Sequence, residues 1–173
     1  MEMSVSKRLS RSLIVVSLLS AHGAWAYSIQ GRVVGVSDGD TITVLDSTKT
    51  QHKIRLAGID APEKKQAFGQ ASKKRLSDMV FDREVILDCG KTDRYRREIC
   101  VVMVDGHDAN LAQVKAGMAW WYWKYKKEQT SQQRASYEAA EAAARTGKVG
   151  LWQVADRIAP WDFRKLRKLA ATK

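Results

Sequence analysis

Short segments in which hydrophobic and polar positions alternate occupy much of the chain after residue 26. Alternation with a period of two places successive side chains on opposite faces of a β-strand. In residues 52–56, for example, Ile54 and Leu56 share one face and Arg55 points to the other. Glycine and Asp-Gly turn signals separate the segments. The pattern predicts five strands, within residues 29–36, 41–44, 52–56, 84–89 and 98–104.

Longer hydrophobic stripes predict about three helices. Residues 66–81 place their apolar side chains roughly on one side of a helix. Asp108 is a good helix N-cap, and Gly117 stops the short helix that follows it. Thr130 with Gln133 resembles a capping box, which opens an alanine-rich helix that ends at a glycine.

The order of these elements indicates an α+β fold. Five short, turn-connected strands with a helix after the third do not form βαβ units. We therefore expect a five-stranded antiparallel β-barrel with helices packed on its outside. Barrels of this size bind ligands on their outer strands and loops.

The first 26 residues have the features of a signal peptide. Basic residues open the segment, an apolar run follows at residues 13–19, and Ala24 and Ala26 are small residues at the positions read by a signal peptidase. We expect cleavage before Tyr27, an exported protein, periplasmic or secreted, and no stable membrane insertion after cleavage. An uncleaved anchor and a buried first helix are the alternatives.

The chain is strongly basic, with a formal net charge of +11. Such a charge favours a polyanionic partner, first nucleic acid and second an anionic membrane or cell-wall polymer. A basic surface that serves only solubility is the alternative. Residues 153–173 form a basic C-terminal extension, which we expect to be loosely held.

Two cysteines flank a polar loop between the last two predicted strands. Cys89 and Cys100 are an even pair in a chain expected to meet oxidising conditions, so a disulfide across a hairpin is one interpretation. Two small buried hydrophobic residues are the other. The pair is too small a set for a zinc site.

Five carboxylates lie between residues 38 and 63 in this basic chain. Asp40 and Asp60 follow turn signals, and two turns that meet at one end of a barrel can hold a hard divalent cation. Glu63 can orient or deprotonate a water for attack on phosphorus. The alternatives are a plain Asp-Gly hairpin turn and a glutamate that favours the start of a helix.

Two arginines are candidates for binding a phosphate. Arg55 points away from the core, and Arg97 lies in the loop between the predicted strands 84–89 and 98–104. A guanidinium both positions a phosphate and neutralises its equatorial oxygens. A solvated surface charge is the alternative for either residue.

The order and spacing of these residues resemble the staphylococcal nuclease (thermonuclease) family. The motifs are Asp38-Gly39-Asp40-Thr41, the segment from Ile54 to Glu63, the segment from Thr92 to Arg97, and a Gly-Met-Ala step that leads into aromatic residues and Tyr125. The resemblance covers roughly residues 28–152, and we take residues 27–152 as the nuclease-like domain. It implies an OB-fold barrel with three helices, one bound Ca²⁺ ion, and hydrolysis of DNA and RNA that leaves 3′-phosphate ends.

The resemblance also implies roles for individual residues. Asp40 and Asp60 would be carboxylate ligands of Ca²⁺, with the Ala61 carbonyl as a third protein ligand. Glu63 would act on the attacking water. The remaining residues would contact the substrate: Arg55 and Arg97 at the scissile phosphate, and Arg94, Tyr95 and Tyr125 at nucleotide phosphate or base.

Three positions depart from the family pattern. Ala61 replaces a threonine, which a backbone carbonyl ligand tolerates. Arg96 replaces a glycine, and a positive φ there would strain the backbone by about 1–3 kcal/mol. Trp123 replaces a tyrosine, so stacking can remain while a hydroxyl contact is lost. We expect at least two of the tryptophans to be core anchors rather than stacking platforms.

We predict a monomeric, Ca²⁺-dependent, sugar-nonspecific endonuclease that acts on DNA and RNA. One alternative is a nucleic-acid-binding OB-fold module that has lost catalysis. The presence of all five acidic and arginine site residues argues against it. The other is a basic envelope-binding protein whose carboxylates are structural.

Overall fold

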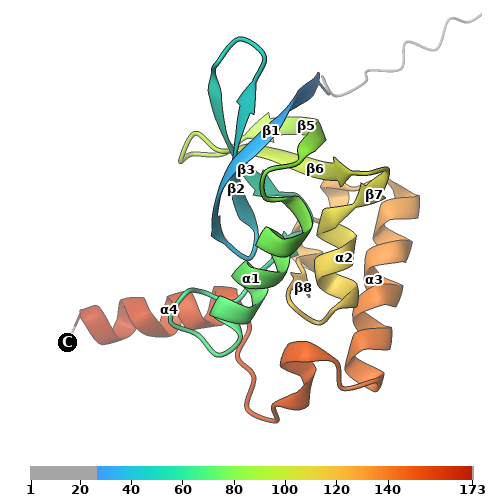
Figure 1. The fold of residues 1–173 in the computed structure, drawn as a ribbon. Coiled ribbons are helices and arrows are strands. Elements are labelled where there is room, and N and C mark those ends of the chain that lie inside the picture. The colour runs from blue at the N-terminus through green and yellow to red at the C-terminus, as the bar shows by residue number, and fades with distance from the viewer. Residues whose placement is uncertain (1–26, 173) are drawn as a thin grey trace, which may run out of the picture.

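The computed structural model describes residues 27–172, so the predicted signal peptide lies outside the described residues. Eight strands and four α-helices make up this part (Figure 1). The strands are β1 (Tyr27–Asp38), β2 (Thr41–Asp46), β3 (Gln51–Leu56), β4 (Ile59–Asp60), β5 (Glu84–Thr92), β6 (Glu98–Val104), β7 (His107–Asp108) and β8 (Trp120–Trp121). The helices are α1 (Gly69–Val80), α2 (Ala109–Lys115), α3 (Ser131–Thr146) and α4 (Pro160–Ala171), with 3₁₀ helices η1 (Trp123–Glu128) and η2 (Gly150–Gln153).

Five strands form a closed barrel, as predicted, and their order in the sheet is β3-β2-β1-β5-β6. Neighbours in this order pair antiparallel, but β3 pairs with β6 in parallel and so closes the barrel. The expectation of a purely antiparallel barrel is therefore corrected at this one seam. Alternation follows the predicted pattern: Val85, Leu87 and Cys89 of β5 are buried, and the residues between them are exposed.

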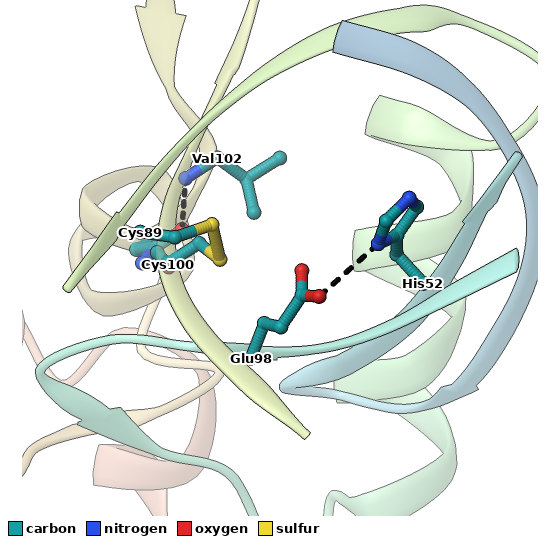
Figure 2. The surroundings of a disulfide bond; sticks show 6 residues. His52, Cys89, Glu98, Cys100 and Val102 are labelled. Atoms are coloured by element: carbon teal, nitrogen blue, oxygen red, sulfur yellow. Dashed lines mark hydrogen bonds and ion pairs between the residues drawn. A yellow bond between two sulfur atoms is a disulfide. The ribbon is translucent and has the colours of Figure 1, made fainter. Parts of the chain in front are cut away.

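The disulfide forms inside this barrel, between residues that face each other across β5 and β6. Cys89 and Cys100 are both fully buried. Glu98 lies beside the bond, and in Figure 2 a dashed line joins its side chain to that of His52, which lies farther from the bond. The bond ties together the two strands that carry the loop with Arg97.

Two of the predicted helix starts appear as expected. The side chain of Asp108 accepts a hydrogen bond from Leu111 N and caps α2, and Thr130 forms a reciprocal capping box with Gln133 at the start of α3. The first helix begins at Gly69 rather than residue 66, because Phe68 takes a left-handed conformation with φ 64°. A turn therefore occupies the first positions of the predicted helix.

The C-terminal extension contains α4, and its first turns are held against the body of the protein. Pro160 is buried, and the Trp161 ring stacks on Tyr122 with centroids 5.0 Å apart. The expectation of a loosely held extension is wrong for these turns, because aromatic packing anchors them. The later turns extend away from the barrel (Figure 1). Among the described residues, no helix combines the length and apolar character needed to cross a bilayer.

Candidate active site

Asp40 lies at the turn between β1 and β2 and is 5% exposed. One carboxylate oxygen accepts a hydrogen bond from Ala61 N at 2.8 Å, and the other pairs with Arg55 Nη1 at 2.7 Å. Burial alone would raise the pKa of Asp40. The charge of Arg55 and the hydrogen bond from Ala61 outweigh it and hold this pKa below its ordinary value.

Arg55 projects from β3 and bridges two aspartates. Its second terminal nitrogen lies 2.8 Å from Asp60 Oδ1 and also donates to the Ile59 carbonyl. The side chain is only 15% exposed. Burial would lower the pKa of Arg55, but the charges of Asp40 and Asp60 raise it, so the guanidinium stays charged. The predicted phosphate ligand is thus fixed in orientation by the two predicted metal ligands.

Asp60 is fully buried at the end of β4, where Ile59 and Asp60 pair with β8. That pairing uses Trp120 and Trp121, which are buried core residues, as expected for at least two tryptophans. Burial raises the pKa of Asp60, while neighbouring guanidinium groups oppose the rise. Burial and the nearby charge of Asp40 also raise the pKa of Asp38, to about 6.

Glu63 lies in the turn after β4 and is partly exposed. Its backbone N donates to the side chain of Gln66 at 3.1 Å. Its carbonyl packs against Gly69, where an added Cβ would lie 2.1 Å from that oxygen. The first residue of α1 must therefore be glycine for this turn to hold Glu63 beside Asp60.

Arg164 of α4 completes the cluster, and sequence reasoning missed it. Its Nη2 lies 2.7 Å from Asp60 Oδ2, and its Nη1 lies 2.8 Å from Glu63 Oε1. The contact to Asp60 spans 104 positions of the chain. The only sequence signal was the basic composition of the extension, which does not single out one arginine.

Arg97 lies apart from this cluster. Its side chain pairs with Asp93 of the same loop, with Nε at 2.8 Å and Nη2 at 2.7 Å. Asp93 also accepts hydrogen bonds from the backbone of Tyr95 and Arg97. Arg96 between them has φ 60°, so this loop does require the left-handed conformation. Among residues 27–172, the ion pairs of the carboxylate cluster involve Arg55 and Arg164 and not Arg97.

The predicted base-contacting residues lie on exposed surface. Tyr95 is 63% exposed, and the Arg94 guanidinium lies over its ring at 4.8 Å. Tyr125 in η1 is 46% exposed, and Lys91 lies over its ring at 5.4 Å. Lys91 also pairs with Glu128 of η1. Aromatic faces next to cations suit the stacking of bases and the neutralising of phosphates.

The donor chemistry at Asp40 and Asp60 fits a hard divalent cation. Both are buried carboxylates, and Arg164 already places a positive charge on Asp60. Within the described part of the chain, the one group of three ligand atoms within 4.8 Å of one another is Cys89, Glu98 and Cys100, whose cysteines are joined in the disulfide. A cation at Asp40 and Asp60 would therefore take further ligands from backbone oxygens, such as the Ala61 carbonyl, and from water.

Comparison with known proteins gives a consistent result. Residues 53–154 match the family described as staphylococcal nuclease homologue. A Haemophilus influenzae protein named uncharacterized endonuclease is 40% identical over 161 residues, covering 93% of this chain and 86% of its own. A Shigella flexneri protein named micrococcal nuclease is 38% identical over 164 residues, covering 90% of this chain and 91% of its own. Protein ParB of Escherichia coli is 38% identical over 157 residues, covering 86% and 85%.

Proposed function

From the fact that this chain belongs to the staphylococcal nuclease family, we propose that it is a Ca²⁺-dependent, sugar-nonspecific endonuclease. Its substrates would be DNA and RNA, and its products would carry 3′-phosphate ends. Relatives named endonuclease and micrococcal nuclease support nuclease activity in general. The observation that carries the proposal is one buried guanidinium, Arg55, bridging Asp40 and Asp60 beside Glu63.

Arg55 is oriented before any substrate arrives. Its two terminal nitrogens are held by Asp40 and Asp60, so binding a phosphate would cost little side-chain entropy. A planar guanidinium can then neutralise charge that develops on the equatorial oxygens in the transition state. When bound at Asp40 and Asp60, Ca²⁺ would supply further neutralisation of phosphate charge.

Glu63 would accept the proton of the attacking water. It is partly exposed, unlike Asp40 and Asp60, so solvent can reach it. The water oxygen forms the new bond to phosphorus, Glu63 takes its proton, and the bond to the 5′ oxygen breaks. The leaving 5′ oxygen takes a proton from solvent water, and the phosphate stays on the 3′ side.

The remaining predicted residues would guide the nucleic acid. Arg94, Tyr95 and Tyr125 form an exposed surface of cations and aromatic rings, which suits binding without sequence preference. Arg97, held by Asp93, would reach the phosphate from its loop once substrate binds. We further propose a monomer that acts after export, in the periplasm or outside the cell.

Digestion of single- and double-stranded DNA and RNA tests the proposal, with Ca²⁺, with Mg²⁺ and with a chelator. We expect cutting with Ca²⁺ that the chelator abolishes, and 3′-phosphate ends. Glu63→Gln should lower kcat by about 10²–10⁴. Glu84→Gln makes the same change at an exposed position of β5 and should keep full activity. Binding without cutting would instead identify an inactive nucleic-acid-binding module.

A further inference from the structure

The guanidinium of Arg164 contacts two carboxylates of the proposed active site. One is Asp60, a proposed metal ligand, and the other is Glu63, the proposed general base. Arg164 donates to both oxygens of Asp60, at 2.7 and 3.2 Å, and to Glu63 Oε1 at 2.8 Å. Asp60 is fully buried, whereas the Arg164 side chain is 40% exposed. The carboxylates belong to the barrel end of the domain, and the cation comes from the extension. The extension therefore contributes a positive charge to the site.

The start of α4 is anchored, which explains how Arg164 reaches the site. Trp161 stacks on Tyr122 with ring planes 4° apart, and the Lys124 ammonium lies 5.4 Å from the centroid of the Trp161 ring. The side chain of Gln66 donates to the Ile158 carbonyl just before the helix. Trp161 and Arg164 are three positions apart, so they lie on the same side of α4. Docking of the tryptophan thus presents the arginine to Asp60.

The hold on α4 is confined to its first turns. Beyond Arg164, every described residue of the helix is exposed, including Leu166 at 53% and Leu169 at 65%. Figure 1 shows this end of α4 leaving the body of the protein. The docking therefore rests on the ion pairs of Arg164, the Trp161–Tyr122 stack, and the packing of Ala159 and Trp161 against a small buried cluster, and the later turns add little to it.

We propose that Arg164 is a built-in competitor for the divalent cation, and that α4 is a latch that cation binding opens. The inference rests on the proposed function. Arg164 holds Asp60 Oδ2 at 2.7 Å, whereas Arg55 contacts Asp60 through Oδ1. A metal ion that binds Asp60 through Oδ2 would compete with Arg164 for that oxygen and repel its charge, and so displace Arg164 while Arg55 stays in place. The same displacement frees Glu63 to accept a proton.

When no metal is bound, the positive charge of Arg164 offsets part of the free-energy cost of burying the Asp40 and Asp60 carboxylates. Asp40 and Asp60 together carry two negative charges in a buried site, and Arg55 supplies only one positive charge. Arg164 supplies the second. Removing it would leave the apo site with an uncompensated negative charge, and a divalent cation would then bind without first breaking an ion pair.

Calorimetric titration of the full chain with CaCl₂ tests this inference. Arg164→Ala should tighten the Kd for Ca²⁺ about tenfold. Arg167→Ala removes the same charge from an exposed position of the same helix, so its Kd should stay within about twofold of that of the unaltered protein. Arg164→Lys keeps the charge without the two-pronged geometry and should fall between them.

An unchanged or weaker Kd in Arg164→Ala would overturn the latch, and weaker binding would indicate that Arg164 supports the site. Digestion of DNA at saturating Ca²⁺ separates this failure from failure of the proposed function. If the unaltered protein cuts but its Kd equals that of Arg164→Ala, the latch alone is wrong. If it neither binds Ca²⁺ nor cuts, the proposed function fails and the latch fails with it.

Discussion

Arg55 Nη1 lies 2.7 Å from Asp40 Oδ1, and this pair is the centre of the buried cluster. Asp40 follows a tight turn, and Arg55 lies opposite Thr41 in the β2–β3 pairing. Strand register therefore brings the two side chains together before any ligand is present. The ion pair has a structural function as well as the catalytic one proposed, and the two can be separated by experiment.

Replacing Arg55 should destabilise the protein as well as inactivate it. Arg55→Ala leaves Asp40 and Asp60 without their shared cation, and we expect a loss of about 3–5 kcal/mol in the free energy of unfolding. Urea unfolding measures this loss. Added Ca²⁺ should recover part of it, because the ion would neutralise the same carboxylates. An Arg55→Ala protein as stable as the original would show that the cluster tolerates uncompensated charge.

Relief of backbone strain at Arg96 should stabilise the protein. Arg96 has φ 60°, a conformation that costs a residue with a Cβ about 1–2 kcal/mol. Arg96→Gly should raise the free energy of unfolding by about 0.5–1 kcal/mol, after the greater chain entropy of glycine is subtracted. Arg96→Ala is the control, because alanine keeps the Cβ and so the strain. Equal stabilities of the two variants would rule out strain as the cause.

The Cys89–Cys100 disulfide should contribute about 2–3 kcal/mol to the free energy of unfolding, because it restricts the unfolded chain. The short loop that it closes keeps this contribution at the lower end of the usual range. We expect a reductant to lower the Tm of the unaltered protein and to leave that of a Cys89→Ala/Cys100→Ala variant unchanged. Thermal unfolding followed by circular dichroism measures both. A reductant effect of the same size on the variant would point to a cause other than this bond.

His52 should make stability depend on pH. Its ring nitrogens lie 3.0 Å from Asp46 Oδ2 and 3.1 Å from Glu98 Oε1. The bond to Asp46 raises the pKa of His52, partial burial lowers it, and Glu98 raises it again, so the net value lies above 6.5. The folded state therefore favours the protonated ring.

This contribution is fully present below the ordinary pKa and is lost as the pH rises through the raised one. Urea unfolding at about pH 5.5, 7 and 8.5 should show it, and His52→Gln should remove this part of the pH dependence. A variant with the same pH profile as the original protein would exclude His52 as its source.

Local pattern was enough to predict much of this protein. Alternation in residues 52–56 placed Arg55 opposite Ile54 and Leu56, and the caps at Asp108 and Thr130 appear where the sequence predicts them. These features depend only on residues that are close in the chain, so they can be predicted from the sequence. The resemblance to the nuclease family predicted that Asp40, Arg55, Asp60 and Glu63 belong to one site, and the structure brings these four side chains into one cluster.

Other features needed the tertiary structure, because they join residues that are distant in the chain. The β3–β6 seam is parallel, although every turn signal indicated antiparallel neighbours. Arg97 pairs with Asp93 of its own loop, which motif spacing did not predict. Arg164 reaches Asp60 across 104 positions because Trp161 docks on Tyr122, and composition alone cannot distinguish it from the other basic residues of the extension. Residue type and spacing were enough to predict Asp40 and Asp60 as candidate metal ligands, and long-range packing decided that Arg164 lies on Asp60.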